Sequence, residues 1–530
     1  MSASREKKNR QGNQPMTDKQ RQAQAQAAVA KRNRILYTVL GIAVAVAVIV
    51  LLVWDSGIIQ KNAVAASIGG TDYTVADVSY YYNQTKNNFI NTVEMYKQQL
   101  GYDPFGYDTS KSPAQQTYST NEETGEVTTY ADFFLQSSLD GMQRIAALNA
   151  AAEAEGYTLS EEGKKDLEDW DAQINDLATQ NNTSRKAILT SLYGSYVTEA
   201  QYEENLYRGF LADDYQNAHQ EAIDTSDSAL DAYFEEHQDI LSSYSYHYAP
   251  MSGIPEAKTD ADGKAIEATE EEKTAAMADA KARAEAMMAA VKAGEDFDTI
   301  AKDYVSEKDK DTYSTKGVTL RTGVLGSTIS SVFQDWMTDS ARKEGDIQVF
   351  ENNGNGYVVV QYVDRVRDDL STVNVRHILI KPEAETEDAT QFTDEAWAAA
   401  EEQAKTILTQ FMAGEKTAEA FGKLADEHSD DGRSTSGDLA APGGLYSNVK
   451  PGDMVEAFDA WIYDDARKEG DTGLVKTEFG WHVMYFAGRN EPSWKLSAKS
   501  ALVNDTMTTW LEELVANYEI VEADGLSSVK

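Results

Sequence analysis

The sequence contains no cysteine and only six histidines in 530 residues. Without cysteine there can be no disulfide, thiolate zinc site, cysteine nucleophile or lipid-modified N-terminal cysteine. The scarcity of histidine argues against a histidine-rich metal site, and we expect neither metal nor cofactor. The motifs HExxH, GxSxG, the phosphate-binding loop and GxGxxG in a strand–helix context are also missing, which argues against the enzyme classes that depend on them.

Basic residues are few compared with acidic ones, 48 against 88, and the formal net charge is −40. A chain this acidic repels a phosphate backbone, so we expect no nucleic-acid partner. Hydrophobic residues make up 41 % of the chain and aromatic residues 10 %, which is enough for sizeable cores and excludes a wholly disordered protein. The length predicts about three domains.

The N-terminal region differs from the rest in charge and hydropathy. Residues 1–34 hold nine basic and two acidic residues, a net charge of +7, and are predicted to be disordered. Residues 35–54 follow, twenty residues without a formal charge, which predicts a single transmembrane helix. Lys31, Arg32 and Arg34 precede it, so the positive-inside rule predicts a cytoplasmic N-terminus.

The apolar segment could also be a signal peptide, because Ala63-Val64-Ala65 has the small-x-small pattern of a cleavage site. The run is longer than a signal peptide needs, and the site lies far from its end, so we favour an uncleaved anchor. The bulk of the chain would then be extracytoplasmic. The lack of cysteine is compatible with a Gram-positive cell surface.

The outer region begins with a strand–turn–strand pattern at 62–76, with Gly69-Gly70 at the turn. Apolar residues then recur with a helical period over 77–240. Residues 102–130 are rich in Pro, Gly, Ser and Thr, and predict an irregular loop. Another amphipathic helix is predicted in the tail, at 496–518.

The second half of the chain contains an internal duplication. Phe333–Asp346 and Phe458–Asp471 are identical at nine of fourteen positions, including all six of ARKEGD. The similarity extends upstream and downstream of these segments. We therefore predict two copies of one unit, at 241–368 and 372–492.

The second copy carries a series of motifs in a fixed order: VRHIL, SDD, GDL, PGDMVEAF, EG and TEFGWH. In this order and spacing they resemble the parvulin family of peptidyl-prolyl cis–trans isomerases. The whole chain resembles the extracytoplasmic foldases of the PrsA/SurA/PpiD-like kind.

The resemblance implies an α+β fold. The chain would begin with the single N-terminal transmembrane helix predicted above, followed by a mostly helical chaperone domain at 62–240, which a C-terminal helix within 494–530 completes. Two tandem parvulin-like domains follow from the duplication, each an antiparallel sheet with surrounding helices. The domain at 372–492 would be the isomerase and the domain at 241–368 a degenerate copy.

The resemblance also implies roles for particular residues. A catalytic hydrogen-bonded network would be formed by His377, Asp431, Thr477 and His482. The proline-binding pocket would be lined by Leu439, Met454 and Phe458. Rotation about a peptide bond breaks no bond, so it requires no nucleophile, metal or cofactor. Asp431 stands where some family members have cysteine, which argues further against covalent catalysis.

Two features of the second copy depart from the family pattern. The connection at 440–453 is several residues longer than usual, which could reshape the pocket rim. The segment after the first strand is acidic, whereas phosphate-directed parvulins have a basic cluster there, so we expect no preference for phosphoserine-proline. In the first copy, His247 is equated with His377, and Val358 stands in place of the second histidine.

The leading hypothesis is a membrane-anchored peptidyl-prolyl isomerase and chaperone that assists the folding of exported proteins. The alternative is a holdase chaperone without isomerase activity, whose parvulin folds serve as polypeptide-binding surfaces. A surface adhesion or scaffolding protein is a third hypothesis. The predicted partners are unfolded exported polypeptides and the membrane, and a homodimer is left open.

Overall fold

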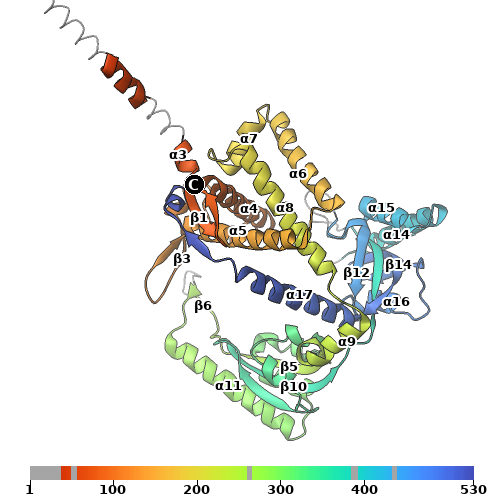
Figure 1. Cartoon of the computed structure of the whole chain (residues 1–530). Helices are drawn as coiled ribbons and strands as arrows, with labels where there is room; N and C mark the ends of the chain where they lie inside the picture. The colour runs from red at the N-terminus through yellow and green to blue at the C-terminus, as the bar shows by residue number, and fades with distance from the viewer. Residues whose placement is uncertain (1–37, 49–56, 260–264, 384–391, 433–438, 530) are drawn as a thin grey trace, which may run out of the picture. The chain divides into compact units, whose positions relative to one another are not determined.

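The computed structural model of the chain describes residues 38–48, 57–259, 265–383, 392–432 and 439–529. Two compact units are formed, one by Met1–Ile223 with Thr506–Lys530 and one by Asp224–Asp505 (Figure 1). Helices and sheets are mixed in both units, and the α+β class is confirmed. The domain boundaries given above stay predictions.

The transmembrane helix of the sequence analysis is not confirmed. Within 35–54 the structure describes residues 38–48 as helix, and these eleven residues rise only about 16 Å, roughly half the thickness of a hydrocarbon core. In the part of the chain that the structure describes, no helix is long and apolar enough to cross a membrane. The prediction is therefore wrong for the described residues, and the rest of 35–54 lies outside them.

The unit of 1–223 and 506–530 contains a three-stranded antiparallel sheet of order β15-β1-β2, formed by β1 (Val64–Ile68), β2 (Thr71–Thr74) and β15 (Ile520–Glu522). Gly69 and Gly70 join β1 to β2, and both have positive φ, 57° and 81°. A two-residue hairpin turn of type I′ requires positive φ at both central positions, which glycine adopts without steric cost. The strand–turn–strand pattern of the sequence therefore forms as a hairpin, and the C-terminal strand extends its sheet.

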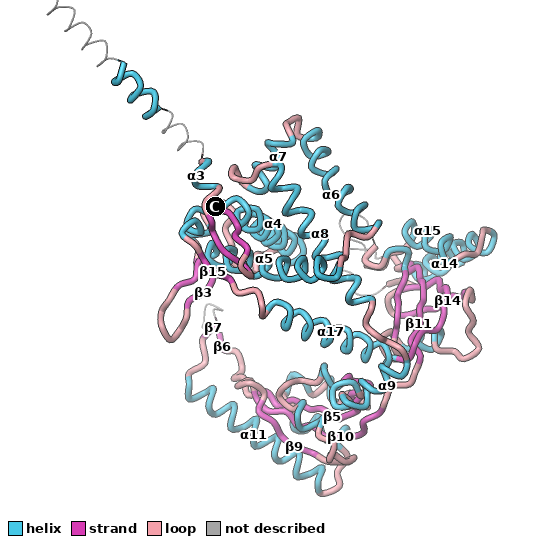
Figure 2. The backbone as a smooth tube through the Cα atoms, viewed as in Figure 1, coloured by secondary structure: helices cyan, strands magenta, loops and turns pink. Residues whose placement is uncertain are grey.

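Helices make up most of this unit. They are α3 (Ile58–Lys61), α4 (Val75–Leu100), α5 (Tyr130–Glu155), α6 (Glu161–Gln180), α7 (Arg185–Tyr193) and α8 (Glu199–Glu221). Thr74, Thr129 and Thr198 begin α4, α5 and α8 with capping boxes, which satisfy free backbone N–H groups of the first turn. Figure 2 shows α4, α5 and α8 packed together beside the three-stranded sheet.

The segment 102–130 is more regular than the sequence indicates. Its strands β3 (Thr117–Thr120) and β4 (Val127–Thr129) form an antiparallel hairpin. The hairpin is followed directly by α5, whose Phe133 stacks on Tyr118 with ring centroids 4.2 Å apart. Aromatic packing against a helix therefore orders a segment whose composition alone predicts a loop.

The unit of 224–505 contains two four-stranded antiparallel sheets of equivalent topology. The first sheet has the order β8-β5-β10-β9, and the second sheet has the order β12-β11-β14-β13. Each sheet has its two longest strands in the centre, one from the beginning and one from the end of its segment. The sequence duplication therefore reappears as a repeated strand order.

The elements of the first sheet and its helices are β5 (Ser243–Ser252), α11 (Glu270–Lys292), α12 (Phe297–Tyr304), β8 (Leu320–Leu325), α13 (Gln334–Thr338), β9 (Ile347–Glu351) and β10 (Gly356–Val366). A short hairpin, β6 (Lys258–Thr259) and β7 (Ala265–Ile266), interrupts them, and α9 (Asp227–Glu236) and α10 (Gln238–Leu241) precede them.

The elements of the second sheet and its helices are β11 (Ser371–Ile380), α14 (Asp394–Ala413), α15 (Ala418–His428), β12 (Leu445–Val449), α16 (Glu456–Ile462), β13 (Thr472–Thr477) and β14 (Gly480–Pro492). The chain then continues into α17 (Ser493–Val515), which links the two units along the sequence.

Alternation along β11 separates two cores. Ile378 and Ile380 pack with α14 and α15 on one face of the second sheet. Val373 and Val375 pack with α16 on the other face. Successive side chains of a strand point to opposite faces, so His377 lies on the face of α16, which we call the pocket face, and Arg376 on the face of α14 and α15, the helix face.

The strand registers correct the proposed match between His247 and His377. In the second sheet His377 pairs with Met484, two residues after His482. In the first sheet Val360, two residues after Val358, pairs with Tyr248. Tyr248 is therefore the counterpart of His377, and His247 corresponds to Arg376. His247 lies on the helix face, stacked on Phe297 of α12.

Candidate active site

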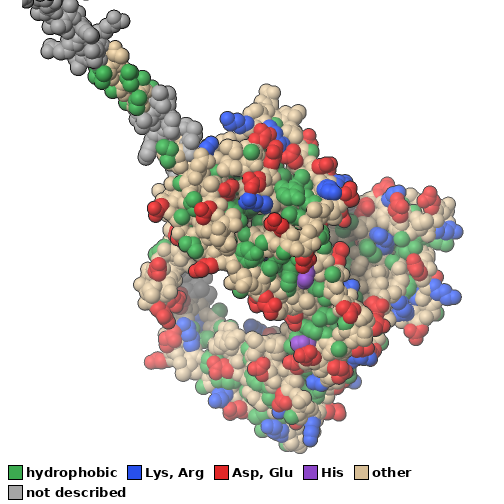
Figure 3. All heavy atoms as spheres, viewed as in Figure 1, with side chains coloured by type: hydrophobic (Ala, Val, Ile, Leu, Met, Phe, Trp, Pro, Cys, Tyr) green, Lys and Arg blue, Asp and Glu red, His purple; other side chains and the backbone are tan. Residues whose placement is uncertain are grey.

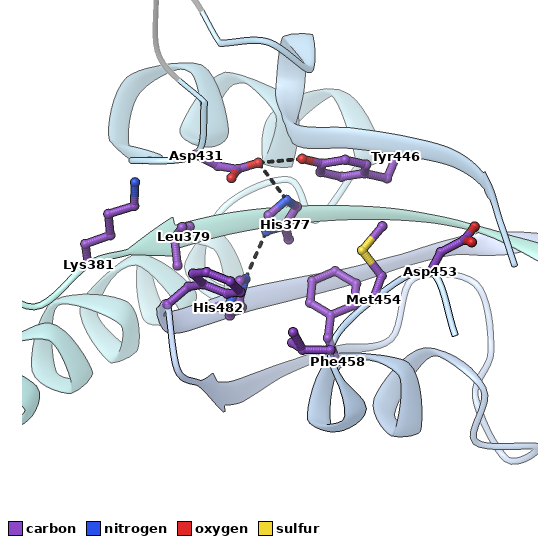
Figure 4. A pocket seen from close by; sticks show the side chains of 11 residues that line it. His377, Leu379, Lys381, Asp431, Tyr446, Asp453, Met454, Phe458 and His482 are labelled. Carbon is purple, nitrogen blue, oxygen red and sulfur yellow. Dashed lines mark hydrogen bonds and ion pairs between the residues drawn. The ribbon is translucent and has the colours of Figure 1, made fainter. Parts of the chain in front are cut away.

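A cavity of about 280 Å³ opens on the pocket face of the second sheet (Figure 4). It is lined by His377, Leu379, Lys381, Asp431, Tyr446, Asp453, Met454, Val455, Phe458, Phe479 and His482. These residues come from β11, β12, β14, α16 and the loops between them. We call this cavity the second-sheet pocket.

Two histidines on neighbouring central strands form the polar base of the pocket. His377 lies on β11 and His482 on β14, and their side chains are almost fully buried. The register places His482 opposite Leu379, so the two histidines are diagonal neighbours on one face. Nδ1 of His377 lies 3.1 Å from Nδ1 of His482, which is the distance of a direct hydrogen bond between the rings.

Each ring has a second polar partner on its outer side. Nε2 of His482 lies 2.8 Å from the hydroxyl of Thr477 at the end of β13. Nε2 of His377 lies 3.2 Å from a carboxylate oxygen of Asp431, although the direction of approach is not that of a well-aligned hydrogen bond. The hydroxyl of Tyr446 donates to the same oxygen at 2.7 Å.

This chain of contacts determines the tautomers of both rings. A proton on Nε2 of His377 faces the ionised Asp431, and Nδ1 of that ring is an acceptor when it carries no second proton. His482 must then donate from Nδ1, and its Nε2 accepts the hydroxyl proton of Thr477. In this arrangement donation runs in one direction, from Thr477 through both rings to Asp431.

The electrostatics of the pocket agree with this assignment. The contact with His377, and then the hydroxyl of Tyr446, lowers the pKa of Asp431 to about 2 against the opposing effect of burial. Burial, followed by repulsion from His377, lowers the pKa of His482 to about 3. Burial and the bond to Asp431 raise the pKa of Tyr446 to about 12. Near neutral pH the pocket thus holds an ionised Asp431, a neutral His482 and a neutral Tyr446.

Apolar side chains form the wall opposite the histidines. Phe458 lies on α16, and its ring is nearly perpendicular to both imidazoles, with centroids 5.3 Å from each. Met454, two residues before α16, lines the pocket beside it (Figure 4). An unbranched thioether adapts to irregular apolar ligands. The wall can therefore hold a compact apolar ring against the histidine pair.

The structure brings together six of the seven site residues predicted from the sequence. Five of them line the cavity: His377, Asp431, Met454, Phe458 and His482. Thr477 is not among the lining residues, but its hydroxyl is hydrogen-bonded to His482. Leu439 is the exception. It is buried in the core between the second sheet, α14 and α15, so it is not among the residues that line the pocket.

Tyr446 is a pocket residue that the sequence analysis did not identify. It comes from the long connection at 440–453, which forms the edge strand β12. Gly443 and Gly444 precede this strand with positive φ, and a Cβ at Gly444 would collide with the backbone carbonyl of His377. The glycine pair followed by LYSNV was the available signal for a strand that approaches β11 closely.

Lys381 and Asp453 were also missed, because neither belongs to a motif that the sequence analysis used. Both line the pocket, and Figure 4 shows their side chains at its two ends. Within the described ranges, no group of three or more His, Asp or Glu side chains is arranged to hold a metal ion. The chemistry that this pocket offers is hydrogen bonding, burial and local charge.

Comparison with known proteins identifies the domain that contains the pocket. Residues 377–488 match the family described as Rotamase: PPIC-type PPIASE domain. The chain is 26 % identical over 256 residues to Chaperone SurA of Nitrosococcus oceani, covering 44 % of this chain and 52 % of the relative. It is 31 % identical over 142 residues to Foldase protein PrsA 1 of Listeria monocytogenes, covering 26 % of this chain and 39 % of the relative.

These alignments span about half or less of the length of the curated relatives. Among solved structures, the peptidylprolyl isomerase PrsA from Bacillus cereus matches with 15 % identity and a TM-score of 0.17, covering 79 % of this chain and 98 % of that chain, a likeness on which nothing below rests. The family match and the curated relatives confirm the resemblance read from the sequence motifs, and the chain is a parvulin-domain protein similar to the SurA and PrsA foldases.

Proposed function

We propose that this protein is a peptidyl-prolyl cis–trans isomerase whose reaction takes place in the second-sheet pocket. The observation that carries the proposal is the buried histidine pair, bonded at 3.1 Å, in a cavity walled by Met454 and Phe458. Family membership supports it, because the matched domain contains both histidines.

The pocket fits the energetics of rotation about a prolyl bond. Rotation must cross about 18–20 kcal/mol because twisting removes the amide resonance. The planar amide carries more charge separation than the twisted one, so an apolar environment disfavours the planar form relative to the transition state. Met454 and Phe458 would supply this environment for the proline ring.

The polar groups would act on the carbonyl that precedes proline. A neutral His482 does not add a positive charge that would stabilise the carbonyl oxygen of the planar ground state. The carboxylate of Asp431, ionised because its pKa is lowered to about 2, repels the partial negative charge of that oxygen. Both effects favour the twisted form, in which this charge is smaller.

The test is an isomerisation assay on the full chain with a proline-containing peptide and with a protein whose refolding is limited by proline. His482→Ala should lower kcat/KM by about 10²-fold, the range reported for the loss of one positioned polar group. Val358→Ala, at the equivalent position of the first sheet, should leave it within twofold. Equal rates for His482→Ala and the unaltered protein would contradict the proposal.

We further propose that the protein acts as a chaperone for unfolded polypeptides outside the cytoplasm. The names of the SurA and PrsA relatives, a chaperone and foldases, support the chaperone role. Exposed apolar side chains in the helical unit support it too. Among them are Met95, Tyr102, Phe105, Tyr118 and Val127, each between 39 % and 61 % exposed.

Such exposed aromatic side chains are typical of surfaces that contact other polypeptides. The double variant Tyr102→Ser/Tyr118→Ser should delay aggregation of an unfolded client less than the unaltered chain does. Tyr207→Ser is the matched control, because Tyr207 is an exposed tyrosine of α8, outside the hairpin region. Equal protection by the double variant and the control would contradict this part of the proposal.

A further inference from the structure

The first sheet has a pocket of its own at the position equivalent to the second-sheet pocket. Its volume is about 310 Å³, and its lining is Tyr246, Tyr248, Arg321, Thr328, Ser330, Val332, Phe333, Asn352 and Val358. We call it the first-sheet pocket. It lies on the pocket face of the first sheet, where Phe333 takes the place that Phe458 has in the sequence repeat.

The strand registers allow the two pockets to be compared residue by residue. Tyr248 replaces His377 and Val358 replaces His482. Tyr246 pairs with Arg321, as Val375 pairs with Tyr446, so Arg321 replaces Tyr446. No carboxylate lines the first-sheet pocket. The histidine pair and its charged partner are gone, but the cavity has been kept.

Arg321 is the charged group of this pocket. One of its nitrogens donates to the backbone carbonyl of Val318 at 2.6 Å. Among the described residues no carboxylate lies within ion-pair distance of its guanidinium, whereas Arg342, in the loop between α13 and β9, pairs with Asp339 and Asp346. The guanidinium has five N–H donors in a planar fork, so most of its capacity is left for a ligand.

The surroundings of Arg321 define what that ligand must be. Tyr246, Tyr248, Phe333 and Val358 form an apolar aromatic floor, and Ser330 and Thr328 add hydroxyls at the rim. A guanidinium beside aromatic rings suits a carboxylate that is attached to an apolar or aromatic group.

The net charge of the whole chain further restricts which anionic ligand the first-sheet pocket can bind. The net charge is −40, and acidic side chains are spread over the face shown in Figure 3. A polyanion would be repelled by this field, whereas a single carboxylate flanked by apolar residues loses little by approaching one unpaired cation.

We propose that the first-sheet pocket binds a carboxylate of a client polypeptide next to an aromatic or large apolar residue, and that it does so without isomerase chemistry. The carboxylate pairs with Arg321, and the neighbouring apolar side chain lies on Tyr248 and Phe333. The nature of the client rests on the proposed chaperone function, but the binding chemistry does not. The carboxylate comes from a Glu or Asp side chain or from the chain end.

Titration calorimetry of the full chain with short proline-free peptides tests this proposal. The first peptide contains Glu-Phe with both ends blocked, the second contains Gln-Phe with both ends blocked, and the third contains Gln-Phe with a free C-terminal Phe. At low salt we expect a carboxylate peptide to bind at least tenfold more tightly than the blocked Gln peptide. The difference should shrink with added salt. Preference for the first or the third peptide identifies the source of the carboxylate.

Variants locate the site. Arg321→Gln should abolish the difference between the peptides, and Arg321→Lys should keep part of it, which shows that the fold has survived. Lys343→Gln is the matched control, because Lys343 is an exposed cation in the loop between α13 and β9, outside the pocket. It should keep the full difference.

Two results would overturn the proposal. One is equal binding of all three peptides to the unaltered chain. The other is a carboxylate preference that survives Arg321→Gln but is lost in His482→Ala, which would place binding in the second-sheet pocket. Absence of isomerase turnover would overturn the proposed function and leave this assay unaffected, because none of its peptides contains proline.

Discussion

The two four-stranded sheets share a strand order but differ in what their central strands present to the pocket face. β11 and β14 present His377 and His482, bridged by a hydrogen bond. β5 and β10 present Tyr248 and Val358, which have no such bond. The apolar anchor, Phe458 or Phe333, is kept in both. Both sheets therefore keep the cavity and its apolar anchor, while the second-sheet pocket alone of the two has the histidine pair.

The largest effect on isomerase activity is expected from exchanging the two central residues of one pocket for those of the other. His377→Tyr/His482→Val gives the second-sheet pocket the central residues of the first, and we expect kcat/KM to fall by about 10³-fold, near the range for loss of a complete polar catalytic unit. The reciprocal change, Tyr248→His/Val358→His, should create no activity, since the first-sheet pocket has no carboxylate to orient a histidine.

Isomerisation of a proline peptide by the full-length chain measures both exchanges, with thermal unfolding as a check on folding. Turnover by the reciprocal variant, in a background that carries His482→Ala, would show that two histidines suffice and that Asp431 is dispensable.

The second expectation concerns pH and stability. His482 has a pKa of about 3 in the folded chain and an ordinary value of 6.5. As pH falls below 6.5 the unfolded chain binds a proton that the folded chain does not, so the free energy of unfolding falls toward acid pH. Between pH 7 and pH 5 this single group accounts for about 2 kcal/mol.

Urea unfolding of His482→Gln at both pH values measures this contribution, because glutamine can still bond to Thr477 and His377 but does not titrate. We expect its loss of stability between pH 7 and pH 5 to be smaller than that of the unaltered chain. Replacing the partly exposed His428 by glutamine is the matched control. An unchanged pH dependence in His482→Gln would contradict the assignment of a neutral, buried His482.

The sequence predicted those parts of the molecule that are encoded locally or by a motif. The turn at Gly69-Gly70 follows from two adjacent glycines, and the His377/His482 pair from the ordered motifs of the second copy. Helix starts at Thr74 and Thr129 have capping residues that sequence alone can indicate. These features depend on a few neighbouring positions.

The errors involve long-range geometry. His247 was placed on the wrong face because the alignment was one residue out of register, and a shift of one residue reverses the face of a strand. Leu439 follows the motif, but its side chain packs into the core beneath the sheet. The position of Tyr446 in the pocket depends on the pairing of β12 with β11, which none of the sequence motifs used above indicates. The membrane helix was inferred from hydropathy alone, which the described helix at 38–48 does not support.

A smaller effect is expected from Tyr446, the residue that Arg321 replaces in the first sheet. Tyr446→Phe removes one hydrogen bond to Asp431 and should lower kcat/KM by about fivefold, corresponding to about 1 kcal/mol for one hydrogen bond. The pKa of Asp431 should rise toward its ordinary value, because a group that lowers it has been removed.

Steady-state kinetics and carboxyl NMR titration measure these two effects. Tyr463→Phe is the matched control, because the hydroxyl of Tyr463 donates to the carbonyl of Val449, away from the histidines. It should reduce stability by a similar amount and leave kcat/KM within twofold. A larger loss of kcat/KM in the control than in Tyr446→Phe would contradict the proposed contribution of Tyr446 to the hydrogen-bonded network.

The smallest effect on turnover is expected at His247, where the register distinguishes a structural histidine from a catalytic one. Nδ1 of His247 lies 2.8 Å from the hydroxyl of Thr319, which donates to Asp298. These contacts, with the stacking on Phe297, hold β5 against α12. His247→Ala should lower the free energy of unfolding by about 1 kcal/mol and leave turnover within twofold, whereas His377→Ala should abolish most of the turnover. Urea unfolding and the isomerase assay on both variants check this contrast. If His247→Ala impaired turnover as strongly as His377→Ala, His247 would after all be the functional counterpart of His377, and the difference between the two pockets would have to be sought elsewhere.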